Sequence, residues 1–325
     1  MNILITSAGR RVSLLTYFQQ DVKRLLGHNS KVFATDLNPS MSTACLKSDG
    51  SFEVGQFSDP NFMEIFRSIC IENNIKIVIP TIDTELKLLA EHRNAFEADG
   101  IQLIVSDSRF VKICRDKRLM NTFFLENGFK IPAEIDRHNP KFPLFIKPID
   151  GSSSQNIFLI KDETMLSTFH LQREDFMFME YLNPERYREY TIDLYYNTDG
   201  ILKCIVPRIR LAVRGGETNK GITRKNHLVE FVRAKLGSIE GARGCLTLQV
   251  FDDLESEDVY GIEINPRFGG GYPLSYLAGA NYPAWIIEEY GLGREIPDFD
   301  DWKSNMLLLR HDAEMVVPDF KFGEA

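Results

Sequence analysis

The first 110 residues alternate short apolar runs with amphipathic segments, and this alternation constrains the fold more than any other feature of the sequence. Apolar runs predict strands, and apolar residues at helical spacing predict the helices between them. The expected strands lie within 2–8, 31–37, 75–81 and 101–106, and the expected helices lie within 11–26, 62–73 and 84–99. Strands separated by helices of this length form a parallel, doubly wound sheet. Such sheets bind ligands at the carboxyl ends of their strands.

The pattern changes after Ser106. One helix is expected over 108–127, and apolar runs near 142–148, 157–161 and 176–182 then predict a small α+β unit. From Tyr190 onward strands dominate, with one helix at 227–236 and a last strand in NMLLLR that is either an edge or a closing strand. A chain of 325 residues is long enough for two or three such compact units.

Composition excludes several classes of protein. The chain is 43% hydrophobic and 26% charged, the mix of an ordinary globular protein. Its net charge of −8 argues against nucleic acid as the main partner, because that binding depends on clustered Lys and Arg. No apolar run reaches the ~18–20 residues of a membrane span. The five cysteines form no CxxC or Cys/His cluster, so we expect reduced core thiols in a cytoplasmic protein rather than a zinc site.

Three polar residues alternate along the segment GIEINPR. On an extended chain Glu263, Asn265 and Arg267 point to one side, because side chains alternate between the two faces of a strand. Carboxylate and amide oxygens suit Mg²⁺, and a guanidinium suits a phosphate bound to that metal. A solvated edge strand is the simpler alternative, but the Gly-rich stretch 268–271 that follows favours a site.

The strand that precedes GIEINPR adds a fourth candidate. LTLQVF and VYGIEIN predict a hairpin around the acidic turn 252–258. If the turn centres on Ser256, Gln249 lies opposite Glu263 in the antiparallel pair. The oxygen of Gln249 then joins the same cluster.

Further candidates lie upstream of this hairpin. Lys147 ends a strand just before the turn GSSS, whose backbone N–H groups and hydroxyls could bind an anion. A solvated hairpin turn is the alternative, since the spacing of a P-loop is absent. Farther on, the strand FMFMEYL ends at Glu180, where backbone groups could contact an adenine edge, and Glu189 could accept from ribose hydroxyls. By chemistry alone each glutamate is more often a surface residue.

In this order, the segments resemble the ATP-grasp superfamily, in particular the carbamoyl-phosphate-synthetase large-chain-like ligases. The resemblance implies a fold of α/β and α+β class: a Rossmann-like pre-ATP-grasp domain on the acceptor side over 1–110, then a two-lobed ATP-grasp domain over 111–325. A small nucleotide lobe is expected at about 115–182 and a large metal-binding lobe at about 183–310. Only one ATP-grasp unit and no glutaminase is recognised, so carbamoyl phosphate synthesis by this chain alone is not expected.

The resemblance also implies roles for individual residues. Contacts to the phosphates and base of ATP are assigned to Lys117, Lys147, Gly151, Ser152, Ser153 and Ser154. The adenine and ribose contacts are assigned to Glu180, Tyr181, Leu182 and Glu189. The ligands of Mg²⁺, or of Mn²⁺, are assigned to Gln249, Glu263 and Asn265. The arginines beside the γ-phosphate are Arg267, Arg210 and Arg214.

The activity implied by the resemblance is a ligation that consumes ATP. ATP phosphorylates a carboxylate to an acylphosphate, an amine or other nucleophile displaces the phosphate, and ADP is released. Two alternatives stay open: an ATP-binding regulatory protein without turnover, and a small-molecule kinase. The expected partners are small molecules, with no nucleic acid and no membrane, and the choice between a monomer and a homodimer is left open.

Two further expectations concern the acceptor and a segment rich in Gly and charge. The acceptor is expected at the strand ends of the first unit, where Arg10 and Arg11 either bind an acceptor carboxylate or are surface charges at a helix start. The segment 214–226 is rich in Gly, Thr, Asn and charge, so we expect it to be mobile and to order over the phosphates of a bound nucleotide.

Overall fold

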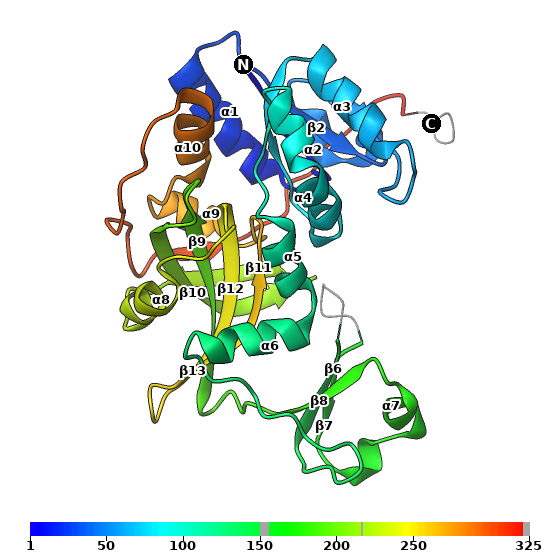
Figure 1. Ribbon diagram of the computed structural model, residues 1–325, viewed down its shortest axis with the longest axis vertical. Helices are drawn as coiled ribbons and strands as arrows, with labels where there is room; N and C mark the ends of the chain where they lie inside the picture. Colours follow the sequence, from blue (N-terminus) through cyan, green and yellow to red (C-terminus); the bar gives the residue numbers. More distant parts are fainter. Residues whose placement is uncertain (150–155, 216, 321–325) are drawn as a thin grey trace.

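The computed structural model describes residues 1–149, 156–215 and 217–320 (Figure 1). Its strands form three sheets, of five, three and six strands. Gly151, Ser152, Ser153 and Ser154, the predicted phosphate loop, lie outside the described residues. Within the described part of the chain no helix is long and apolar enough to cross a membrane.

The first sheet is the doubly wound parallel sheet that the sequence predicts. Its strands are β1 (Asn2–Ile5), β2 (Val32–Asp36), β3 (Ser51–Glu53), β4 (Ile75–Ile79) and β5 (Gln102–Leu103), in the order β3-β2-β1-β4-β5. The helices between them are α1 (Val12–Leu26), α2 (Thr43–Lys47), α3 (Phe62–Glu72) and α4 (Asp83–Ala98), with a 3₁₀ turn at Pro39–Met41. The strand order reverses between β1 and β4, and α1 and α4 begin just after these two strands. Ligands bind at such a reversal in open α/β sheets.

The largest sheet is antiparallel and carries the second half of the chain. Its strands are β9 (Tyr187–Tyr196), β10 (Leu202–Arg214), β11 (Glu217–Thr223), β12 (Gly244–Asp253), β13 (Val259–Asn265) and β14 (Leu307–Leu309), in the order β13-β12-β9-β10-β11-β14. The associated helices are α8 (Leu228–Leu236), α9 (Tyr272–Leu277) and α10 (Tyr282–Ile286), the last continued by a π-helical turn at Ile287–Gly291. Of the two expected alternatives for the last strand, β14 is an edge strand.

The third sheet forms a small lobe that projects below the rest of the molecule in Figure 1. It contains β6 (Leu144–Pro148), β7 (Phe158–Ile160) and β8 (Phe176–Glu180) in the order β7-β6-β8, with a 3₁₀ turn at Glu163–Met165 and α7 (Thr168–Gln172). This lobe has a hydrophobic core of its own. The first sheet and the largest sheet instead share one continuous core, and Tyr17 of α1 stacks on Tyr276 of α9 with ring centroids 3.6 Å apart.

Two segments differ from expectation. The helix predicted over 108–127 is two helices, α5 (Ser108–Arg115) and α6 (Lys117–Glu126), because Asp116 is extended and its side chain caps α6 by accepting from Arg118 N at 2.9 Å. In the segment 214–226, where the sequence predicts no strand, the structure has β11, which pairs with β10 on one side and β14 on the other. The ordering of this segment over a bound nucleotide stays a prediction. Backbone pairing orders this strand despite its few apolar side chains.

Candidate functional site

A cavity of about 590 Å³ lies between the small lobe, one face of the largest sheet and the start of α1. Residues far apart in the sequence line it. Of the predicted site residues, the structure brings eleven together here: Lys117, Lys147, Glu180, Tyr181, Leu182, Glu189, Arg210, Gln249, Glu263, Asn265 and Arg267.

Strand register explains why so many polar residues share this face. In β12 and β13, Gln249 pairs with Glu263, as the predicted hairpin requires. The next strands continue the row, because Thr191 of β9 pairs with Gln249 and Arg208 of β10 pairs with Thr191. Side chains two residues apart on each strand lie on the same face, so Asn265 joins Glu263.

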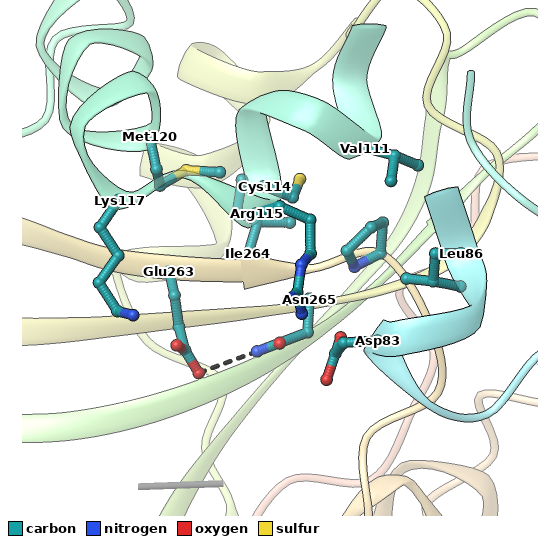
Figure 2. Close-up of a pocket in the computed structure, with 11 residues that line it drawn as sticks. Asp83, Leu86, Val111, Cys114, Arg115, Lys117, Met120, Glu263, Ile264 and Asn265 are labelled. Carbon is teal, nitrogen blue, oxygen red and sulfur yellow. Dashed lines mark hydrogen bonds between the residues drawn. The ribbon is translucent and has the colours of Figure 1, made fainter. Parts of the chain in front are cut away.

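The predicted metal ligands contact one another. Glu263 Oε1 accepts from Asn265 Nδ2 at 2.9 Å, a bond drawn in Figure 2, which shows a smaller pocket beside the cavity. With its amide oriented to satisfy both neighbours, Gln249 donates from nitrogen to Glu263 Oε1 at 2.9 Å and accepts from Arg210 Nη1 at 2.8 Å.

This donor set fits a hard divalent cation if the side-chain amides of Gln249 and Asn265 rotate so that their oxygens face it. One carboxylate and two amide oxygens are then presented on one sheet face, and oxygen ligands are what Mg²⁺ and Mn²⁺ accept. The amides are essential to the set, because the described residues contain no group of three His, Cys, Asp or Glu placed to hold a metal. The nearby Lys117 reaches toward the same space (Figure 2).

The two lysines make the small-lobe side of the cavity cationic. Lys147, at the end of β6, is only 8% exposed, and its burial lowers the pKa to about 8. The neighbouring Lys117 lowers this pKa further, whereas Glu263 raises it. Lys117 is held beside β6, since its Nζ donates to Ile149 O at 3.4 Å. A polyanion bound between the lysines would restore the charged form of Lys147.

Two of the predicted arginines, Arg267 and Arg210, line the cavity and are paired with carboxylates. Arg267 Nη2 lies 2.7 Å from Asp83 Oδ2, the first residue of α4, so it links the metal-ligand strand to the reversal point of the first sheet. Arg210 Nη1 donates to Glu189 Oε1 at 3.0 Å. On the small lobe, Glu180 accepts from Ala133 N at 3.2 Å. Arg214 does not line the cavity; its side chain is 69% exposed and bonds to Asp312.

Sequence reasoning did not identify Arg208, which lines the cavity while its guanidinium bonds the buried carboxylate of Asp193 at 2.8 and 2.9 Å. Its alternation with Arg210 in PRIRLAV was the available signal, because the two residues share a strand face. Gly271 packs so closely on Arg208 that a Cβ there would overlap the guanidinium. The Gly-rich stretch therefore has a packing role.

Several buried polar atoms around the cavity lack a hydrogen-bond partner. They are Thr191 Oγ1, Arg208 Nη1, Arg210 Nε and Arg267 Nε, each on a cavity-lining residue. Buried polar atoms without partners are uncommon in folded proteins and call for a ligand or a solvent molecule. Their concentration here marks the face as a binding surface.

Two family models match the sequence. Residues 3–104 match the model described as "PylC-like, N-terminal domain", and residues 172–310 match "ATP-grasp in the biosynthetic pathway with Ter operon". No curated protein sequence matches the chain.

Solved structures share the fold at low sequence identity. The biotin carboxylase complex from Campylobacter jejuni superposes with a TM-score of 0.72 at 14% identity, over 94% of this chain and 74% of that one. The L-amino acid ligase from Bacillus licheniformis superposes with a TM-score of 0.65 at 17% identity, over 89% of this chain and 73% of that one. Rhizobium etli pyruvate carboxylase superposes with a TM-score of 0.63 at 14% identity. The match covers 86% of this chain but only 27% of the carboxylase.

Proposed function

We propose that this chain, an ATP-grasp protein with a PylC-like N-terminal domain, is an ADP-forming ligase that joins a small-molecule carboxylate to an amine or another nucleophile. One observation carries the proposal: a single cavity combines two lysines, an oxygen-rich Gln–Glu–Asn set and Arg267. These are the groups that a triphosphate, its metal ion and a transferring phosphoryl group need.

Each wall of the cavity supplies a different part of the reaction. Lys117 and Lys147 bind the phosphates of ATP, and Glu180, Tyr181, Leu182 and Glu189 line the place of the nucleoside. Gln249, Glu263 and Asn265 hold Mg²⁺, which neutralises charge on the phosphates when it is bound. Arg267 then exchanges Asp83 for the phosphoryl group while that group moves from ATP to the acceptor carboxylate. The nucleophile attacks the resulting acylphosphate and releases the phosphoryl group as phosphate. Enclosure by the small lobe protects the acylphosphate from water.

The same proposal divides the chain at about residue 110 into an acceptor-side domain and an ATP-grasp domain, with lobes near 115–182 and 183–310. The described cysteines are all free, four of them buried, which supports a cytoplasmic location. A homodimer stays a prediction, to be checked by light scattering.

Oxygen transfer tests the reaction directly. We expect ADP release with Mg²⁺ and ATP to depend on one acceptor from a panel of amino acids, amines and carboxylates. With an acceptor whose carboxylate carries oxygen-18, one labelled atom should appear in the released phosphate, because the acylphosphate bridge oxygen leaves with phosphorus. Unlabelled phosphate would refute a ligase that acts through an acylphosphate.

The two alternatives give different results. A kinase would release ADP without phosphate and accumulate the phosphorylated acceptor, with no requirement for an amine. A regulatory protein would bind Mg·ATP but release no ADP with any acceptor. The oxygen-rich donor set around Glu263 favours an enzyme over a regulatory protein without turnover.

A further inference from the structure

An arginine cluster closes the first-domain end of the cavity. Glu217 of β11 lies among three guanidinium groups: Arg310 Nη1 at 2.8 Å, Arg10 Nη2 at 3.5 Å and Arg11 Nη1 at 3.6 Å. Arg10, Arg11 and Glu217 all line the cavity. Arg310 is fixed from behind, because it also bonds Gly270 O. One carboxylate thus faces three cations.

The charges at this end do not balance. The arginines that converge here are Arg10, Arg11, Arg208, Arg267 and Arg310, and the carboxylates that face them are Asp83, Asp193 and Glu217. Arg208 and Arg267 are each matched by one carboxylate, whereas three arginines share Glu217, so the ion pairs leave an excess of two positive charges in a protein whose net charge is −8. A cation-rich cleft in an acidic protein attracts and concentrates anionic ligands.

Arg10 and Arg11 carry the unused binding capacity. Neither guanidinium makes a hydrogen bond to a described residue; each is only at ion-pair distance from Glu217. The Arg11 side chain is 19% exposed, and burial lowers its pKa, with Arg267 and Arg310 lowering it further against the effect of Glu217. Burial would raise the pKa of Glu217, but Arg11, Arg310 and Arg10 hold it below its usual value. An arginine fork without hydrogen bonds suits a carboxylate or phosphate.

The place of the cluster in the fold agrees with this reading. Arg10 and Arg11 directly precede the 15-residue helix α1, which follows β1 at the reversal point of the first sheet. Asp83, which holds Arg267, follows β4 on the other side of the same reversal. The cluster therefore lies at the first-domain end of the cavity, away from Lys147 of the small lobe.

We propose that the acceptor substrate carries a second anionic group, a carboxylate or a phosphate, and that Arg10 and Arg11 bind this group while the reacting carboxylate lies beside Arg267. This inference rests on the proposed ligase function and narrows its substrate to dianionic compounds. Two excess positive charges match two anionic groups. Glu217 acts as the resident counter-ion that holds the arginines in place and competes with the substrate anion for them.

Because Glu217 competes with the substrate anion, substitutions at Arg11 and at Glu217 should change the affinity for that anion in opposite directions. Replacing Arg11 by glutamine removes a partner of the second anion, so its binding weakens. Replacing Glu217 by glutamine removes a like charge and frees Arg10 and Arg11, so binding of the same anion strengthens. A purely structural role for the cluster would weaken binding in both variants.

The experiment compares matched probes in the presence of Mg²⁺ and a non-hydrolysable ATP analogue. Succinate is compared with its monoamide, and O-phospho-L-serine with L-serine, by calorimetric titration of the full chain. We expect the dianionic member of at least one pair to bind about tenfold tighter or more. The pair that shows the preference identifies carboxylate or phosphate as the second group. Arg11→Gln should abolish the preference, and Glu217→Gln should increase it.

Controls distinguish a lost preference for the second anion from misfolding and from failure of the proposed ligase function. Arg24→Gln makes the same charge change near the other end of α1, at a side chain 56% exposed, and should keep the preference. Each variant should bind the analogue like wild type, which shows that the nucleotide end is intact. Equal binding of both members of both pairs, or an unchanged preference in Arg11→Gln, overturns the proposal even if oxygen transfer proves the ligase. A preserved preference without oxygen transfer would instead refute only the ligase.

Discussion

Replacing Lys147 by methionine should stabilise the protein while weakening nucleotide binding. The lysine is 8% exposed, and its pKa falls from the ordinary 10.5 to about 8. Each tenfold change in proton affinity corresponds to about 1.4 kcal/mol, so holding the charged form in the folded protein costs about 3 kcal/mol at pH 7. Methionine has a similar length and no charge, and it removes this cost.

The sign of the pH dependence follows from the direction of the shift. Between pH 8 and 10.5 the unfolded chain keeps the proton on Lys147 and the folded protein does not, so wild-type stability rises with pH across this window. The advantage of the variant is therefore full below pH 8 and falls below about 1 kcal/mol at pH 10. In wild type, nucleotide affinity should decrease as the pH rises through 8, because the neutral amine no longer attracts phosphate.

Urea unfolding at pH 7 and pH 10 measures the stability change, and calorimetric titration with Mg²⁺ and an ATP analogue measures binding. We expect a gain of up to about 3 kcal/mol at pH 7 and a loss of nucleotide affinity of about ten- to a hundredfold. Lys161→Met, an exposed lysine after β7 of the same lobe, should change neither quantity appreciably. A Lys147→Met protein that is less stable than wild type at pH 7, or whose gain is the same at pH 10, refutes the reasoning.

Three other variants test the site and its support. Glu263→Gln should lower ADP release by about a hundredfold or more at saturating Mg²⁺ and ATP, with little change in nucleotide affinity. The reason is that the Glu263 carboxylate holds the metal that neutralises the moving phosphoryl group. Wild-type turnover in this variant would show that the metal assignment is wrong. Arg208→Met should cost about 3–5 kcal/mol in urea unfolding, because it leaves the fully buried Asp193 unpaired, and a loss below 1 kcal/mol would contradict this. Gly261→Ala should cost about 1–3 kcal/mol, because the new Cβ overlaps the ring of Phe124; an unchanged unfolding midpoint would show that the ring moves freely.

The periodicity of the sequence was sufficient to predict much of this fold. Apolar runs separated by helical segments predicted the parallel sheet, and counting outward from Ser256 placed Gln249 opposite Glu263, as the structure has it. Both are local consequences of strand and hairpin geometry. The sequence analysis missed the break between α5 and α6, although Asp116 is a residue type that commonly caps a helix N-terminus.

What the sequence could not predict depends on contacts between distant segments. Arg267 and Asp83 are 184 positions apart and meet only because β13 reaches the reversal point of the first sheet. Arg310 reaches Glu217 because the edge strand β14 pairs with β11, and no local pattern announces this pairing. For the same reason strand β11 could not be predicted, because its pairing depends on two neighbouring strands rather than on its own side chains.

Because the hydrophobic interior is divided into separate cores, substitutions in the two cores affect different parts of the cavity. The acceptor end of the cavity is built on one core shared by two sheets, whereas the small lobe rests on a separate core of five buried residues. A substitution in the shared core shifts Arg11 and Arg267 together, so a new acceptor preference is reached mainly by replacing these charged side chains themselves. Substitutions inside the small lobe are repacked locally. A replacement in the small lobe can therefore change how Lys147 is held while the geometry that selects the acceptor stays unchanged.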